Sequence, residues 1–176
     1  MFLWLIAGQP VSGEPLPSPQ WCQWLQDQSV IQTVRESTWV FPTLEWIHIY
    51  SMVFLITVIA ALDLRLMGFQ LDPKTSQPLS QLARRVLRLA WISLGVNAIT
   101  GTFLFASKAP DYYVNVPFRI KLLLVALGVV YHSVVLPILT KRDEVPSAPT
   151  ASKLAGALSL LLWIGVIAAS RWIAFV

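Results

Sequence analysis

Residues 41–62 read FPTLEWIHIYSMVFLITVIAAL, and this stretch decides the fold class. As a helix, a run of this length rises by about 33 Å, which is enough to cross the roughly 30 Å hydrocarbon core of a bilayer. The run is continuously apolar, so it does not fit the short alternating strands of a membrane β-barrel. It predicts a membrane-spanning helix that ends near Asp63 and Arg65.

Three more apolar runs of similar length follow, and polar connections separate all four. The further runs cover about 87–107, 118–140 and 154–174, and the connections cover 70–83, 108–117 and 141–152. Because lipid cannot satisfy free backbone N–H and C=O groups, only helices suit these runs. The pattern predicts an all-α fold, an integral membrane four-helix bundle in contact with the lipid bilayer.

The composition agrees with a membrane protein. Of the 176 residues, 56% are hydrophobic and only 12% are charged, about half the roughly 25% expected of a soluble domain. These values exclude a soluble globular protein, a disordered chain and a disulfide scaffold. The single cysteine, Cys22, cannot form a disulfide within the chain. No dense basic cluster is present, so no nucleic-acid partner is expected.

The first part of the chain predicts an N-terminal segment, residues 1–37, ahead of the bundle at 38–176. Its opening apolar stretch is short and lacks the basic region of a secretory signal, so we expect it to be retained. One helix is expected from Ser18 to Ser37, with Ser18 as the N-cap. Because this helix is amphipathic and carries two tryptophans, it suits the membrane interface. Ordinary packing on the end of the bundle is the alternative.

Basic residues indicate the orientation of the spans. Eight lie on the first and third connections and their flanks, and five lie on the opposite side. The eight are Arg65, Lys74, Arg84, Arg85, Arg88, Lys141, Arg142 and Lys153, and the five are Arg35, Lys108, Arg119, Lys121 and Arg171. This bias predicts a multi-pass protein of a bacterial inner membrane with both termini in the periplasm.

The chain has two histidines, His48 and His132, and both fall within predicted spans. An ionisable ring in hydrocarbon is costly unless it is paired or functional. Neutral imidazole is a good iron ligand, so the pair predicts axial ligation of a haem b between two helices. We expect the two histidines to differ in membrane depth by roughly 5–15 Å. The low end of this range allows one shared haem, and the high end excludes it. The alternative is that each histidine makes a hydrogen bond between helices.

Four other polar residues extend this hypothesis. Glu45 lies three residues before His48 on the same helix face and can orient the imidazole, or it can be solvated at the interface. Arg119 and Lys121 can bind haem propionates or extend to the headgroups. Asn97 can line a cofactor pocket or hydrogen-bond a neighbouring helix, and the second role is favoured.

The predicted function is a haem b-binding electron-transfer subunit that serves a membrane or periplasmic redox partner. A cofactor-free accessory or scaffold subunit of a larger membrane complex is the first alternative. A copper-handling protein that uses His48, Met52 and Cys22 is the second. The sequence has no phosphate-binding glycine loop or nucleophile–base motif, so no independent catalytic activity is expected.

Several longer strings carry a resemblance to a known family. They are RESTWVFPTLEWIH (35–48), DLRLMG (63–68), FLFASKAPDYYVNVPFRIK (103–121), YH (131–132) and the final helix from 155 to 175. The chain resembles, over about 21–176, a family of small bacterial inner-membrane proteins known only as a domain of unknown function.

The resemblance implies four spans and a pattern that includes Glu45, His48, Arg119, Lys121 and His132. Many members have an asparagine before the last histidine, where this chain reads LGVVYHS. A distant likeness to four-helix cytochromes b and copper-resistance proteins is an analogy of fold, which does not establish function.

Overall fold

Four long helices dominate the computed structural model, which describes residues 18–69, 79–135, 138 and 150–175. They are α4 (Val40–Leu66), α5 (Leu79–Ser107), α7 (Val116–Val130), extended by the π-helical turn η1 (Tyr131–Val135), and α9 (Thr150–Trp172). All four are long and apolar enough to span a membrane. No strand occurs in these residues. The prediction of an all-α, multi-pass bundle is confirmed.

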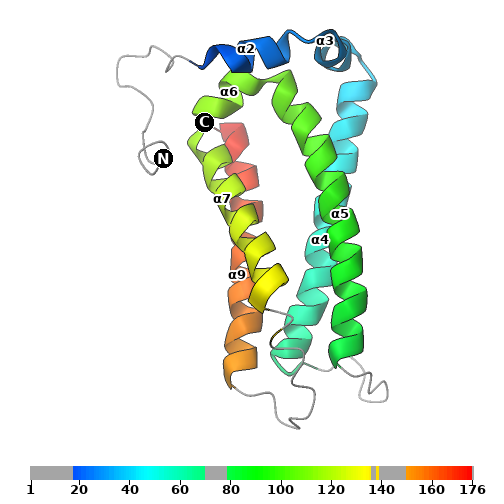
Figure 1. Ribbon diagram of the computed structural model, residues 1–176, viewed down its shortest axis with the longest axis vertical. Helices are drawn as coiled ribbons and strands as arrows, with labels where there is room; N and C mark the ends of the chain where they lie inside the picture. The colour runs from blue at the N-terminus through cyan, green and yellow to red at the C-terminus, as the bar shows by residue number, and fades with distance from the viewer. Residues whose placement is uncertain (1–17, 70–78, 136–137, 139–149, 176) are drawn as a thin grey trace.

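The four helices form two hairpins (Figure 1). Helix α4 packs along α5, α7 packs along α9, and α4 joins the hairpins through α9, whereas α5 and α7 make little contact. The buried side chains of α4 all lie at or beyond Leu55. The hairpins are therefore tightly packed toward the far end of α4 and loosely packed around its first half.

Short helices cover one end of the bundle, which we call the cap end (Figure 1). They are α2 (Gln20–Gln26), α3 (Ser29–Glu36), α6 (Ala109–Val114) and the C-terminal turn η2 (Ile173–Phe175). The opposite end, where α4 ends and α5 and α9 begin, is the loop end. Helix α3 buries Ile31 and Val34 and keeps its other face exposed, as the amphipathic pattern predicts.

The single N-terminal helix and its Ser18 cap were wrong predictions. The backbone of Gln28 is extended (ψ 134°), which separates α2 from α3. Pro19 occupies the N-cap position of α2, without a side-chain cap bond. Residues 1–17, including the rest of the predicted N-terminal segment, lie outside the described residues.

Two predicted connections are partly helical. Helix α5 begins at Leu79, so it contains Arg84, Arg85 and Arg88. The connection at 108–117 contains α6, and α7 follows directly, because Asn115 Oδ1 accepts a hydrogen bond from the Phe118 N–H (2.9 Å). Asn115 thus provides the side-chain cap that starts α7. Most of the predicted connection at 141–152 is outside the described residues.

Candidate functional site

His48 lies between α4 and α5 in the cap-end half of the bundle. Its Nδ1 is 3.1 Å from the carbonyl oxygen of Asn97 and 3.1 Å from Thr100 Oγ1. A Cβ on Gly101 would lie only 3.0 Å from His48 Cε1. The absence of a side chain at Gly101 therefore lets the imidazole lie close against α5.

A polar ladder continues from His48 along the same interface. Asn97 Nδ2 donates to the His48 carbonyl (2.9 Å) and to Ser51 Oγ (3.0 Å). Ser93 Oγ donates to the Ser51 carbonyl (2.7 Å). Asn97 thus makes the interhelical hydrogen bonds expected of it. The ladder fixes the register of α4 against α5 around the histidine.

These hydrogen bonds determine the tautomer of His48. A carbonyl oxygen only accepts, so Nδ1 must carry the proton that it shares with Asn97. With the proton on Nδ1, the Thr100 hydroxyl accepts from the ring while it donates to the carbonyl of Val96 (2.9 Å) or Asn97 (3.2 Å). In the described part of the chain no residue hydrogen-bonds to His48 Nε2. Its lone pair is available, as in a metal-binding histidine whose other nitrogen is held by a carbonyl.

Charged and phenolic groups gather near His48 at the cap end. Lys121 on α7 lies within electrostatic range of the His48 ring. Glu45, one turn from His48, lies within range of Tyr112 on α6. Burial raises the pKa of the Tyr112 phenol, and the negative charges of Glu45 and Asp111 raise it further. The phenol therefore stays protonated and available as a donor at neutral pH.

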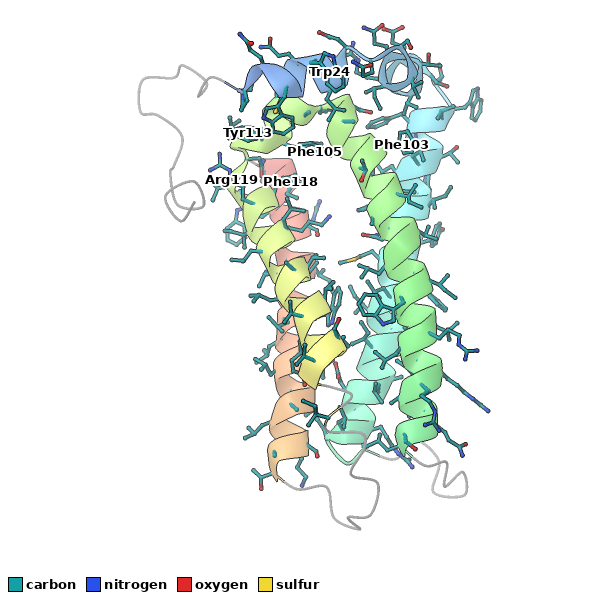
Figure 2. All side chains as sticks on the ribbon, viewed as in Figure 1. Trp24, Phe103, Phe105, Tyr113, Phe118 and Arg119 are labelled. Carbon is teal, nitrogen blue, oxygen red and sulfur yellow. The ribbon has the colours of Figure 1, made fainter. Side chains whose placement is uncertain are left out.

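Arg119 does not join this group in the structure. Its side chain is 2% exposed, and its Nε donates to the carbonyl of Tyr113 (3.0 Å). Its guanidinium also lies 5.9 Å from the centre of the Tyr113 ring, and Figure 2 shows both residues at the junction of α6 and α7. These contacts hold α6 against α7. The role of Arg119 as a propionate ligand stays a prediction.

An aromatic cluster beneath α2 was not predicted from the sequence. Phe105 stacks on Phe118 with ring centres 5.4 Å apart (Figure 2). Tyr112 also stacks on Phe118, with ring centres 5.3 Å apart. Trp21 lies over Phe105 at 6.4 Å and meets Tyr113 edge-on at 5.8 Å. The residues come from α2, α5, α6 and α7, so no local pattern could reveal them. The cluster fastens the cap to the bundle.

His132 lies in a different part of the bundle. It is 5% exposed on η1, with Nδ1 2.8 Å from the Gly128 carbonyl and Nε2 3.4 Å from Ser159 Oγ. It lines a cavity together with Leu55 and Ile59, which follow His48 on α4 by about 10 to 17 Å of helix rise. A shared metal ion would need both ring nitrogens at about 2 Å. The structure therefore does not bring the two histidines to one site.

The cavity beside His132 is too small for a haem. Its volume is about 20 Å³, which suits about one water molecule. Trp163 also lines it, and its buried indole N–H has no hydrogen-bond partner in the described residues. Nor do the described residues contain a group of three or more His, Cys, Asp or Glu that could hold a metal.

The residues of the copper hypothesis are on separate elements. Met52 packs against the core around Leu55 on α4. Cys22 is fully buried on α2, which packs on α5 and α6. The structure therefore gives no sign of a site shared by Cys22 with Met52 or His48. Copper binding stays a prediction without geometric support.

The reactivity of the Cys22 thiol tests whether α2 is packed on the bundle, because a buried thiol reacts slowly. Burial raises the pKa of its thiol, so less thiolate is present at pH 8 than in an exposed cysteine. We expect maleimide to label the folded protein at least about tenfold more slowly than the denatured protein. Mass spectrometry of quenched samples measures the rate. Equal rates in both states would contradict a packed α2.

The comparisons with known proteins place the bundle in a family. A family model matches residues 33–176, which include the end of α3 and all four long helices. The chain belongs to DUF6644, a family of unknown function. This confirms the resemblance seen in the sequence. Searches of curated proteins and of solved structures found no match, and no comparison supports the likeness of this DUF6644 protein to cytochromes b.

Proposed function

We propose that this DUF6644 protein is a membrane redox protein that binds one haem b through His48 alone. The observation that carries the proposal is the fixed tautomer of His48, which presents an unprotonated Nε2 inside the cap-end half of the bundle. Iron in haem requires such a neutral nitrogen. The sequence predicts both histidines as ligands, but only His48 has an Nε2 without a hydrogen-bond partner in the described residues.

The packing around His48 supports this choice. No side chain of α4 before Leu55 is buried, and α5 makes little contact with α7, so a flat ligand can enter here by a small separation of the hairpins. Lys121 makes no hydrogen bond or ion pair within the described residues, and its ammonium can bind a propionate. Glu45 and the Tyr112 phenol supply further polar groups at the cap end.

When bound, the haem supplies one-electron chemistry, and the protein holds and orients it. Asn97 and Thr100 fix the ring of His48, and Lys121 balances the propionate charge. We further propose, from the eight-to-five bias of basic residues, that the cap end faces the periplasm of a bacterial inner membrane. A redox partner would then exchange electrons at the cap end.

A visible spectrum of the purified protein tests the proposal. The protein is expressed with a haem precursor, solubilised in detergent, and measured oxidised and then reduced with dithionite. We expect a Soret band that shifts on reduction, with close to one haem per chain in a pyridine haemochrome assay. A featureless spectrum after haem supplementation would overturn the proposal.

A cofactor-free accessory subunit is the second candidate function. The hydrogen bonds that His48 and Asn97 make across α4 and α5 favour it, because they give both residues a structural role. In that case His48 would serve only to join α4 to α5. Colourless protein that purifies in a complex with another membrane protein would support this candidate over the first.

A further inference from the structure

Asp63 is a buried carboxylate inside a membrane-spanning helix. It is 0% exposed near the loop end of α4, and neither of its oxygens has a hydrogen-bond partner in the described residues. An ionised carboxylate in such surroundings is very costly, because its solvation is lost and nothing replaces it. Asp63 must therefore carry a proton or be compensated from nearby.

The neighbours of Asp63 come from all the elements around it. On α9, Gly156 lies so close to α4 that a Cβ there would be 2.6 Å from the backbone carbonyl oxygen of Asp63. The Ser159 hydroxyl, also on α9, lies beside the side-chain carboxyl group of Asp63. On η1, Tyr131 lies within electrostatic range, although its hydroxyl donates to the Ala155 carbonyl (2.8 Å).

Within the residues that the structure describes, the carboxyl group has no ion-pair partner. Helix α5 meets this part of α4 with apolar residues such as Ala83 and Val86. Charged residues that the structure describes at this end are Arg65, which follows Asp63 on α4, Arg84, Arg85 and Arg88 near the start of α5, and Lys153 on α9, whose side chain approaches Gly68. Among the described residues, the imidazole of His132 on η1 can accept a proton and lies against Ser159.

Ser159 connects the carboxyl group to that imidazole. Because His132 Nδ1 lies 2.8 Å from the Gly128 carbonyl, Nδ1 carries the proton and Nε2 is an acceptor. The Ser159 hydroxyl lies 3.4 Å from Nε2, so it is the only hydroxyl that the structure places against this nitrogen in the described residues. The Ser159 hydroxyl thus lies between the Asp63 carboxyl group of α4 and the His132 imidazole of η1, beside the first and against the second.

We propose that Asp63, Ser159 and His132 form an intramembrane site that stores one proton and moves it between carboxyl and imidazole. The Asp63 O–H proton passes to Ser159 Oγ while the Ser159 hydroxyl proton passes to His132 Nε2. One O–H bond is broken and one N–H bond is formed, which leaves a carboxylate and an imidazolium and moves no electron.

This site does not depend on haem. It uses neither His48 nor any group at the cap end, and its residues lie about 10 Å or more of helix rise beyond His48. A colourless protein would overturn the haem proposal and leave this one unaffected. Intramembrane chains of this composition are typical of proton relays.

Infrared spectroscopy of the full chain in proteoliposomes tests the site. We expect the carbonyl stretch of a protonated carboxylic acid at neutral pH, lost in Asp63→Asn. Asn has the size of a protonated Asp, so this variant should fold with unchanged thermal stability. We expect Ser159→Ala to retain the band and to slow its exchange into D₂O by about tenfold or more, because the positioned relay group is missing.

A matched serine provides the control. Ser170 lies on the same helix α9 and donates to the Val166 carbonyl (2.7 Å), so Ser170→Ala should leave the band and its exchange unchanged. His132→Gln, which keeps a polar side chain, should slow exchange as Ser159→Ala does. The proposal is wrong if Asp63→Asn removes no band, or if Ser159→Ala exchanges as fast as the wild type.

Discussion

Replacing His48 by alanine should remove all haem absorbance from the purified protein, whereas replacing His132 by alanine should leave it in place. Only His48 has an Nε2 without a hydrogen-bond partner in the described residues, and it lies in the half of α4 without buried side chains. The Nε2 of His132 faces Ser159 beside a cavity of about 20 Å³. In a pyridine haemochrome assay, we expect no haem in His48→Ala and close to one haem per chain in His132→Ala.

A glycine beside the ring offers a graded control. Gly101→Ala would place a Cβ 3.0 Å from His48 Cε1, so the ring must move by a few tenths of an ångström. We expect this variant to keep haem with a weaker or shifted Soret band. If His132→Ala loses haem as completely as His48→Ala while both proteins stay folded, a site with His48 as the single ligand is excluded. Ligation of one haem by both histidines would then be supported.

Replacing Gly156 by alanine should cost about 1–3 kcal/mol of stability, the typical cost of overpacking a close contact. The new Cβ would lie 2.6 Å from the Asp63 carbonyl oxygen and 3.3 Å from Leu66 Cβ. Because the first contact is with backbone, α9 must move away from α4. Since α4 joins the two hairpins through α9, this contact holds the bundle together.

Gly95 on α5 is the matched control, because a Cβ there meets nothing within 4 Å. Gly95→Ala should be neutral or stabilising by up to about 1 kcal/mol, since alanine favours helix over glycine. Thermal unfolding in one detergent, followed by circular dichroism, compares both variants with the wild type. A Gly156→Ala melting temperature equal to that of Gly95→Ala would show that α9 does not cross α4 this closely.

The spans were predictable because membrane insertion depends on local composition. A run such as 41–62 is apolar over the thickness of a bilayer whatever its neighbours are, and the structure has α4 there. Their ends were less predictable, because polar residues continue a helix beyond the membrane. Helix α5 therefore includes Arg84 and Arg85. The break between α2 and α3 was also not predictable, because it lies at an extended Gln28 with no glycine or proline beside it.

The candidate site was predictable only in part, by residue type. Intramembrane His48, Asn97 and His132 stand out because polar groups in lipid need partners. Asp63 was interpreted as the polar end of a span, yet it is fully buried, because Gly156 lets α9 approach it. That approach joins residues about ninety positions apart, so no local pattern reveals it.

The sequence by itself determined the four membrane-spanning helices, the family and the polar residues that can carry chemistry. It did so because hydrophobic length and residue type act locally along the chain. Only the tertiary structure decided that His48 contacts α5 while His132 contacts α9, that Arg119 holds the cap, and that Asp63 meets Ser159. The rotation and depth of each helix are set by packing against its neighbours, and these place the histidines in two sites.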